Sequence, residues 1–229
     1  MKEQKKIFRF SLLALAFVFL FNPNLNIVDI LPDFIGYALL CIFLSKLSDM
    51  NEDIAVATKG FLRAFFVDVA KLASIFLVFG NQNPQEQNTL LLLLSFVFAV
   101  LELLILFPAY KALFNGFITL GYKFPNTAVL GKVSANAKAN HTERARLFTF
   151  IFLIVKTAMY TLPEFAVLST HSYDEFAATL YIYDYVGLLR AFAIIVCLVV
   201  GIIWFVHIRA YFSSFDISET VSPARPVLR

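Results

Sequence analysis

The amino-acid sequence predicts an all-α membrane protein, a bundle of six transmembrane helices with both the N and the C terminus in the cytoplasm. Composition is the first of two observations behind this prediction. Hydrophobic residues make up 60% of the 229 residues and charged residues only 15%, whereas a soluble domain has roughly 45–50% apolar and about 25% charged residues. The second observation is the pattern: the apolar residues form six long blocks, and basic residues flank only alternate connections. Lipid is therefore expected to solvate the excess apolar side chains, which include 27 Phe.

The six apolar blocks define the expected spans, which must be helical because a backbone in lipid has to satisfy its own hydrogen bonds. They cover residues 7–22, 32–48, 60–80, 89–109, 146–169 and 180–208. About 20 residues cross the hydrocarbon core, so the first two spans are short and the last is long enough to tilt. The first block follows several lysines, as in a signal peptide. Asn22-Pro23-Asn24 follows it without a small-residue cleavage site, so we interpret it as an uncleaved span.

Basic residues set the orientation, because Lys and Arg accumulate in cytoplasmic connections. The three connections at 22–31, 81–88 and 170–179 contain no Lys or Arg at all. Basic residues instead flank the other two connections and lie at both ends of the chain. This alternation predicts six crossings, with both termini inside.

The only long connection covers residues 110–145 and lies on the cytoplasmic side. We expect a helical continuation to about Gly121, a break at Phe124-Pro125 and an amphipathic stretch over 127–138. Such a stretch either pins the loop to the bilayer or docks a partner, and the sequence leaves both readings open.

Two boundaries complete the predicted organisation. Asn140 and Glu143 have the spacing of a capping box that opens the fifth span. Residues 1–212 are expected to form a single six-helix domain. Residues 213–229 contain two prolines and are expected to be a disordered cytoplasmic tail.

Charged residues inside the expected spans are the unusual feature of the sequence. They are Asp68, Lys71, Glu102, Lys156 and Arg190, with Glu164 and Asp184 nearer the outer ends of their spans. Each charge at mid-bilayer costs about 2.5–3.5 kcal/mol on insertion scales, so pairing is expected. Asp68 and Lys71 are three residues apart on one helical face and can pair locally. We expect Lys156 to form an ion pair with Glu102, and Arg190 to form one with Asp184 or Glu164.

This predicted charge network has two interpretations that the sequence leaves open. The charges either line a water-accessible path for an ion, a proton or a small solute, or they are ion pairs that specify helix assembly. The first interpretation predicts a small transporter or permeation-type protein. The second predicts a non-catalytic membrane protein that binds or regulates a partner, and a membrane-embedded enzyme is a third hypothesis. Besides the lipid bilayer, the expected partners are a small solute or ion, a second copy of the chain or another membrane protein.

The most distinctive local sequence is Asp29-Ile-Leu-Pro-Asp-Phe-Ile-Gly-Tyr37, expected at the outer face. Pro32 suits the first turn of a helix, Asp33 complements the helix dipole, and Gly36 permits close approach of a neighbouring backbone. A cation site formed by Asp29 and Asp33 is the alternative to these structural roles.

This stretch, after a first apolar span, resembles a group of small, uncharacterised bacterial multi-pass membrane proteins that carry a similar D-I-L-P-D-F-I-G-Y motif. The resemblance covers about the first fifth of the chain. It implies a multi-pass topology in a bacterial cytoplasmic membrane, and it implies no substrate or catalytic residue.

The sequence lacks the common enzyme and metal motifs. It has no His-Glu-x-x-His zinc motif, no Gly-x-Ser-x-Gly nucleophile elbow and no phosphate-binding glycine loop. Its three histidines are scattered, and Cys41 and Cys197 lie singly in apolar blocks. We therefore predict no catalytic activity, no metal and no cofactor. The basic residues near aromatic ones are typical of a membrane interface rather than of nucleic-acid binding.

Overall fold

The computed structural model describes residues 5–6, 10–21, 24–25, 28–29, 32–49, 51–80, 84–123, 135–171, 182–213 and 218–219. This part of the chain contains six helices, which confirms the all-α class. They are α1 (Phe10–Leu20), α2 (Asp33–Ser48), α3 (Glu52–Phe79), α4 (Pro84–Lys123), α5 (Ala135–His171) and α6 (Ile182–Ser213). Each helix corresponds to one of the six apolar blocks of the sequence.

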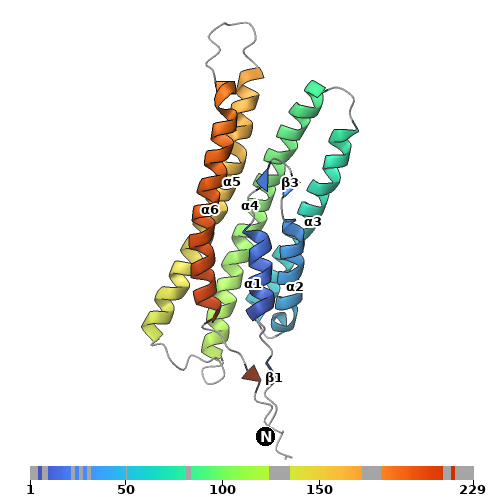
Figure 1. Cartoon of the computed structure of the whole chain (residues 1–229). Helices are drawn as coiled ribbons and strands as arrows, with labels where there is room; N and C mark the ends of the chain where they lie inside the picture. Colours follow the sequence, from blue (N-terminus) through green and yellow to red (C-terminus); the bar gives the residue numbers. More distant parts are fainter. Residues whose placement is uncertain are drawn as a thin grey trace, which may run out of the picture.

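The helices pack in chain order around a common core (Figure 1). Each helix contacts its neighbours in sequence, and α1 also contacts α6, so the packing order closes on itself. Most of the largest fully buried side chains are aromatic and come from five helices, α1, α2, α3, α4 and α6: Phe17, Tyr37, Phe61, Phe114, Phe117, Trp204 and Tyr211. Aromatic rings thus fill much of the interior, as the Phe-rich composition predicts.

Two short antiparallel strand pairs accompany the helices. β1 (Lys5–Lys6) pairs with β4 (Ser218–Glu219), and β2 (Asn24–Leu25) pairs with β3 (Val28–Asp29). The first pair joins segments from the two ends of the chain at one end of the bundle (Figure 1). The tail expected over 213–229 therefore includes three residues in regular structure, Ser213 at the end of α6 and Ser218 and Glu219 in β4, and 214–217 and 220–229 lie outside the described residues.

Helix boundaries differ from the sequence prediction mainly around the long connection over 110–145. α5 begins at Ala135, so the expected capping box at Asn140 and Glu143 lies inside the helix and the predicted start is wrong. Ala-rich sequence before Asn140 favours helix, which extends the segment upstream. α4 continues through Pro108 to Lys123, in agreement with the expected break at Phe124-Pro125. Most of the predicted amphipathic stretch, residues 127–134, lies outside the described residues.

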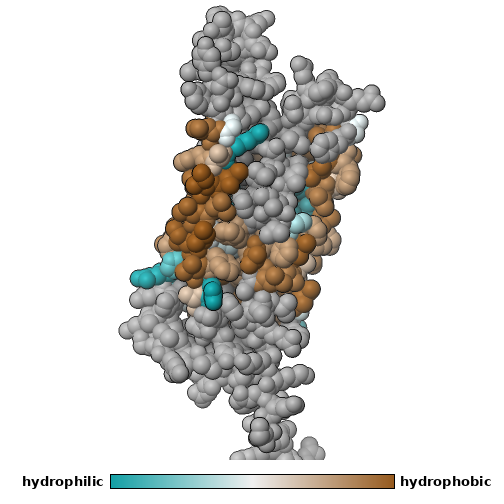
Figure 2. All heavy atoms as spheres, in the orientation of Figure 1, coloured by the Kyte–Doolittle hydropathy of each residue, from teal (hydrophilic) through white to brown (hydrophobic). Residues whose placement is uncertain are grey.

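The outside of the bundle is apolar. Large hydrophobic side chains project from α3, α4 and α6, including Phe76, Leu77, Leu104 and Leu188, which are 66–77% exposed. Figure 2 shows a broad hydrophobic belt on one face of the molecule. Within the described residues, two helical stretches are long and apolar enough to cross a membrane, Leu93–Thr119 in α4 and Gly187–Tyr211 in α6.

Helices α1 and α2 are much shorter than the other four. They have 11 and 16 residues, which correspond to about 16 and 24 Å of helix. The C-terminal end of α1 and the N-terminal end of α2 lie about midway along α4 (Figure 1). Two helix ends are thereby brought into the interior of the bundle, where the buried charged residues Asp33, Asp68, Lys71 and Glu102 also lie.

Candidate functional site

The site is built around the first turn of α2. Pro32 is its N-cap residue, with extended backbone angles (φ −61°, ψ 119°), and its fixed φ suits the start of a helix. Pro32 has no side-chain oxygen with which to accept a hydrogen bond from the first turn. Asp33 is the first residue of the helix and is completely buried. The sequence thus starts a helix in the interior, but another part of the chain must cap it.

Asp68 of α3 supplies this cap. Its Oδ2 accepts a hydrogen bond of 2.6 Å from the backbone N–H of Phe34. Its Oδ1 lies 3.1 Å from the Nζ of Lys71, and both side chains are at most 3% exposed. The local Asp68–Lys71 ion pair expected from the sequence is therefore present. The capping contact to α2 was not predicted.

Lys156 of α5 joins the two helix ends. Its Nζ lies 2.5 Å from Oδ2 of Asp33 and donates a hydrogen bond of 3.4 Å to the carbonyl oxygen of Leu20, the last residue of α1. The C-terminal end of α1 carries partial negative charge, so both contacts favour the ammonium group. Asp33 was expected at the outer face; it lies instead beside Lys156 because the short α1 and α2 meet midway along the bundle.

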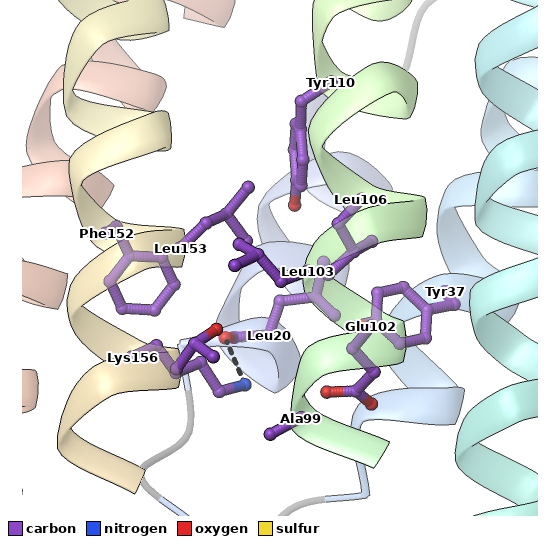
Figure 3. Close-up of a pocket in the computed structure, with 11 residues that line it drawn as sticks. Leu20, Tyr37, Ala99, Glu102, Leu103, Leu106, Tyr110, Phe152, Leu153 and Lys156 are labelled. Atoms are coloured by element: carbon purple, nitrogen blue, oxygen red, sulfur yellow. Dashed lines mark hydrogen bonds between the residues drawn. The ribbon is translucent and has the colours of Figure 1, made fainter. Parts of the chain in front are cut away.

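A small pocket lies beside this ion pair, between α1, α2, α4 and α5 (Figure 3). The volume that the centre of a water molecule can occupy in this pocket is about 30 Å³. About 10–15 Å³ of such volume is enough for one water molecule. The pocket is lined by Leu20, Tyr37, Ala99, Glu102, Leu103, Leu106, Tyr110, Phe152, Leu153, Lys156 and Thr157. A few water molecules fit here, and the polar side chains offer them hydrogen-bond partners.

Glu102 is the acidic group of the pocket. It lies on α4 and is 8% exposed, and Figure 3 shows its carboxylate next to the ring of Tyr37. Tyr37 is also within electrostatic reach of Asp33 and Asp68. Glu102 and Lys156, which the sequence analysis expected to meet, line the same pocket. An ion pair joins Lys156 to Asp33, which the sequence analysis did not predict.

Gly36 and Arg190, two further residues singled out from the sequence, do not line this pocket. A Cβ atom on Gly36 would lie 2.8 Å from Cγ of Leu20, so the predicted close approach of a neighbouring element is present. Arg190 is a partly buried residue of α6. Its expected partners Asp184 and Glu164, and the carboxylate of Asp29, are side chains outside the described part of the structure.

Two tyrosines of the site were missed from the sequence. Tyr37 follows Asp33 by four residues on α2, and Tyr110 follows Glu102 by eight on α4. Both spacings place the tyrosine on the same helical face as the acid, so the signal was available. Phe152, which lines the pocket, stacks on Trp204 of α6 with ring centroids 4.4 Å apart, and this links the sixth helix to the site.

Metal ligation has no evident place in the described residues, where no group of three or more His, Cys, Asp or Glu side chains lies close enough to hold an ion. No protein-family model, no curated protein and no solved structure matches the chain.

Proposed function

We propose that this chain is a six-span protein of a bacterial cytoplasmic membrane, with both termini inside, and that it conducts or transports a small ion through the interior of the bundle. The membrane assignment is supported by the apolar stretches of α4 and α6 and by the exposed apolar side chains. Six crossings are supported by connections 22–31, 81–88 and 170–179, which lack Lys and Arg. The bacterial assignment rests on the resemblance of the Asp29–Tyr37 motif.

The observation that carries the transport proposal is the pocket with the charged residues Glu102 and Lys156 in its wall. Ionisable groups within membrane helices are costly, and they mark ion and proton pathways when they meet a water-sized space. Two helix ends also meet beside the pocket, as in transporters whose interrupted helices form a site near the middle of the membrane. The volume of about 30 Å³ favours a small ion over a metabolite.

The second candidate function is a non-catalytic membrane protein that binds or regulates a partner. It is favoured by the two lysines of the site, since each already contacts an acid. In that case the charges would fix how the helices assemble. Ion flux separates the two candidates, because a network with a purely structural role moves nothing.

The test is a flux assay with the purified full chain in proteoliposomes. Proton and small-ion movement is followed with entrapped dyes for the wild type, Glu102→Gln and Lys156→Met. Glu143→Gln and Lys111→Met are matched controls. Glu143 is exposed on α5, the helix that carries Lys156, and Lys111 is exposed on α4, the helix that carries Glu102. We expect flux in the wild type and the controls and its loss in Glu102→Gln. A wild type that moves no ion in a broad panel would refute transport and favour the partner-binding candidate.

The topology has a separate test. Alkaline phosphatase fused after residue 85 or 175 is expected to be active, because the enzyme needs the outer side. A fluorescent protein at the C terminus is expected to fold and fluoresce in the cytoplasm. An inactive phosphatase at either position would refute the six-span arrangement.

A further inference from the structure

We propose that α3 carries a binding site for an anionic phospholipid, with the headgroup phosphate held by Lys59 and Arg63. The proposal rests on the membrane assignment made above, and it does not depend on ion transport. Three features of α3 carry it: a line of exposed residues along the helix, the position of the two cations in that line and the chemistry of their side chains.

The line of exposed residues runs along the outside of α3. It consists of Glu52, Val56, Lys59, Arg63, Phe66, Ala70, Ala73 and Leu77, all of which are exposed. Successive members are four or three residues apart, so they lie one above the other on a single helical face. The opposite face, with Phe61, Ala64 and Asp68, is buried. The line is therefore the face that α3 turns away from the bundle.

Lys59 and Arg63 are neighbours in this line. They are four residues apart, which corresponds to about 6 Å along the helix axis, and like charges at this spacing repel each other. The acidic residues nearest to the pair in the sequence are Asp53 and Asp68, six residues before the lysine and five after the arginine. Neither spacing is the three or four residues at which side chains meet along a helix. An anion bound between the two cations relieves their repulsion.

Arg63 lies within the apolar belt. A Cβ atom on Gly60 would lie 2.6 Å from that of Ala109 on α4, and α3 and α4 run antiparallel (Figure 1). Three residues farther along α3, Arg63 is therefore near the level of Leu106, which lines the pocket. Its neighbour in the exposed line, Phe66, is 61% exposed. A cation that faces lipid among apolar side chains is costly, and pairing with an anion relieves the cost.

An anionic phospholipid matches both parts of this line. Its phosphate group can accept two parallel hydrogen bonds from the guanidinium group of Arg63, while the ammonium group of Lys59 adds a compact charge. Its acyl chain can lie along the exposed apolar residues up to Leu77. The helix extends about 21 Å from Arg63 to Leu77, which exceeds half of a hydrocarbon core about 30 Å thick. A soluble phosphate would leave this apolar part of the line unused, and the cationic headgroup of a zwitterionic lipid would be repelled by the pair.

Native mass spectrometry of the purified full chain in detergent micelles tests the site, because it counts bound lipids. The protein is titrated with phosphatidylglycerol and, separately, with phosphatidylcholine. We expect the wild type to prefer phosphatidylglycerol. A basic residue next to an anionic lipid contributes about fivefold in affinity, so the double variant Lys59→Gln/Arg63→Gln should bind phosphatidylglycerol about 25-fold more weakly. Lys59→Gln alone should lose about fivefold, which provides the measurement if the double variant does not fold.

The double variant Arg144→Gln/Arg146→Gln is the matched control. It also removes two exposed cations, so the net charge changes by the same amount. Its two positions are only two residues apart on α5 and do not share one helical face. We expect this control to keep the preference for phosphatidylglycerol. An equal loss of affinity in the control would overturn the proposal, because the lipid would then respond to net charge and not to the line on α3.

Two further outcomes would overturn the proposal. One is equal affinity of the wild type for the two lipids. The other is displacement of phosphatidylglycerol by inorganic phosphate at a similar concentration, which would assign the two cations to a soluble anion. The result is separable from the proposed transport: lipid preference without ion flux would support this site and refute transport, and ion flux without lipid preference would do the reverse.

Discussion

Replacing Lys156 with Met should destabilise the protein strongly, because it leaves the Asp33 carboxylate buried beside an apolar side chain. Asp33 is completely buried, and its Oδ2 lies 2.5 Å from Nζ of Lys156. Removing one partner of a buried ion pair costs about 3–5 kcal/mol, mainly through the charge that remains. The same variant also removes the donor to the carbonyl oxygen of Leu20 at the end of α1.

A double-mutant cycle isolates the contribution of the pair. Asp33→Asn alone leaves the ammonium group without its carboxylate, and we expect a loss of stability of the same order as in Lys156→Met. The variant with both substitutions has neither charge. It should be more stable than the sum of the two single effects predicts, by about 2 kcal/mol, within the range measured for residues in contact.

Trp204 provides the optical probe for this cycle. It is the single tryptophan of the chain, it is 1% exposed, and it stacks on Phe152 in the wall of the pocket. Unfolding of each variant in mixed micelles is followed by tryptophan fluorescence, with Lys111→Met as an exposed control that should change stability by less than about 0.5 kcal/mol. Strictly additive effects of the two substitutions would refute the argument that Lys156 and Asp33 stabilise each other.

Two further predictions concern contacts between neighbouring helices. Asp68→Ala removes the acceptor of the Phe34 N–H and the carboxylate partner of buried Lys71, which should cost about 3–5 kcal/mol and speed amide hydrogen exchange at the start of α2. Asp68→Asn keeps an oxygen there and should restore the protection of the Phe34 N–H. Unchanged exchange in the alanine variant would contradict the capping role. A Cβ atom on Gly60 would lie 2.6 Å from that of Ala109 on α4, so Gly60→Ala should cost about 1–3 kcal/mol by forcing α3 and α4 apart. Gly187 has no such neighbour within 4 Å, so Gly187→Ala should leave stability unchanged or raise it by up to about 1 kcal/mol, and equal effects at the two glycines would contradict the packing argument.

The number and approximate positions of the helices could be predicted from the sequence, because long apolar blocks separated by polar connections are a local property of the chain. The Asp68–Lys71 pair was predictable for the same reason, since three residues of helix fix their relative position. The start of α5 was missed because propensity extends a helix beyond a capping signal at Asn140. Local signals therefore located the helices better than they located the helix ends.

The partner of Lys156 could not be predicted, because it depends on how far each helix extends into the bundle. From the sequence, Asp33 was expected at the outer end of the second apolar block, far from the middle of the fifth. The short α1 and α2 instead bring Asp33 to Lys156. Lys156 and Asp33 are 123 positions apart in the chain. A contact over such a separation depends on tertiary packing, and the local sequence pattern does not indicate it.

The position of Lys156 explains how two short helices end inside the bundle. Its ammonium group contacts Asp33 on α2 and the carbonyl oxygen of Leu20 at the end of α1, and it lines one pocket with Glu102 of α4. The polar groups at a buried helix end need partners from elsewhere in the chain, and one side chain of α5 supplies a partner to both ends. Lys156 therefore couples the packing of α1 and α2 against α5 to the shape of the pocket beside Glu102.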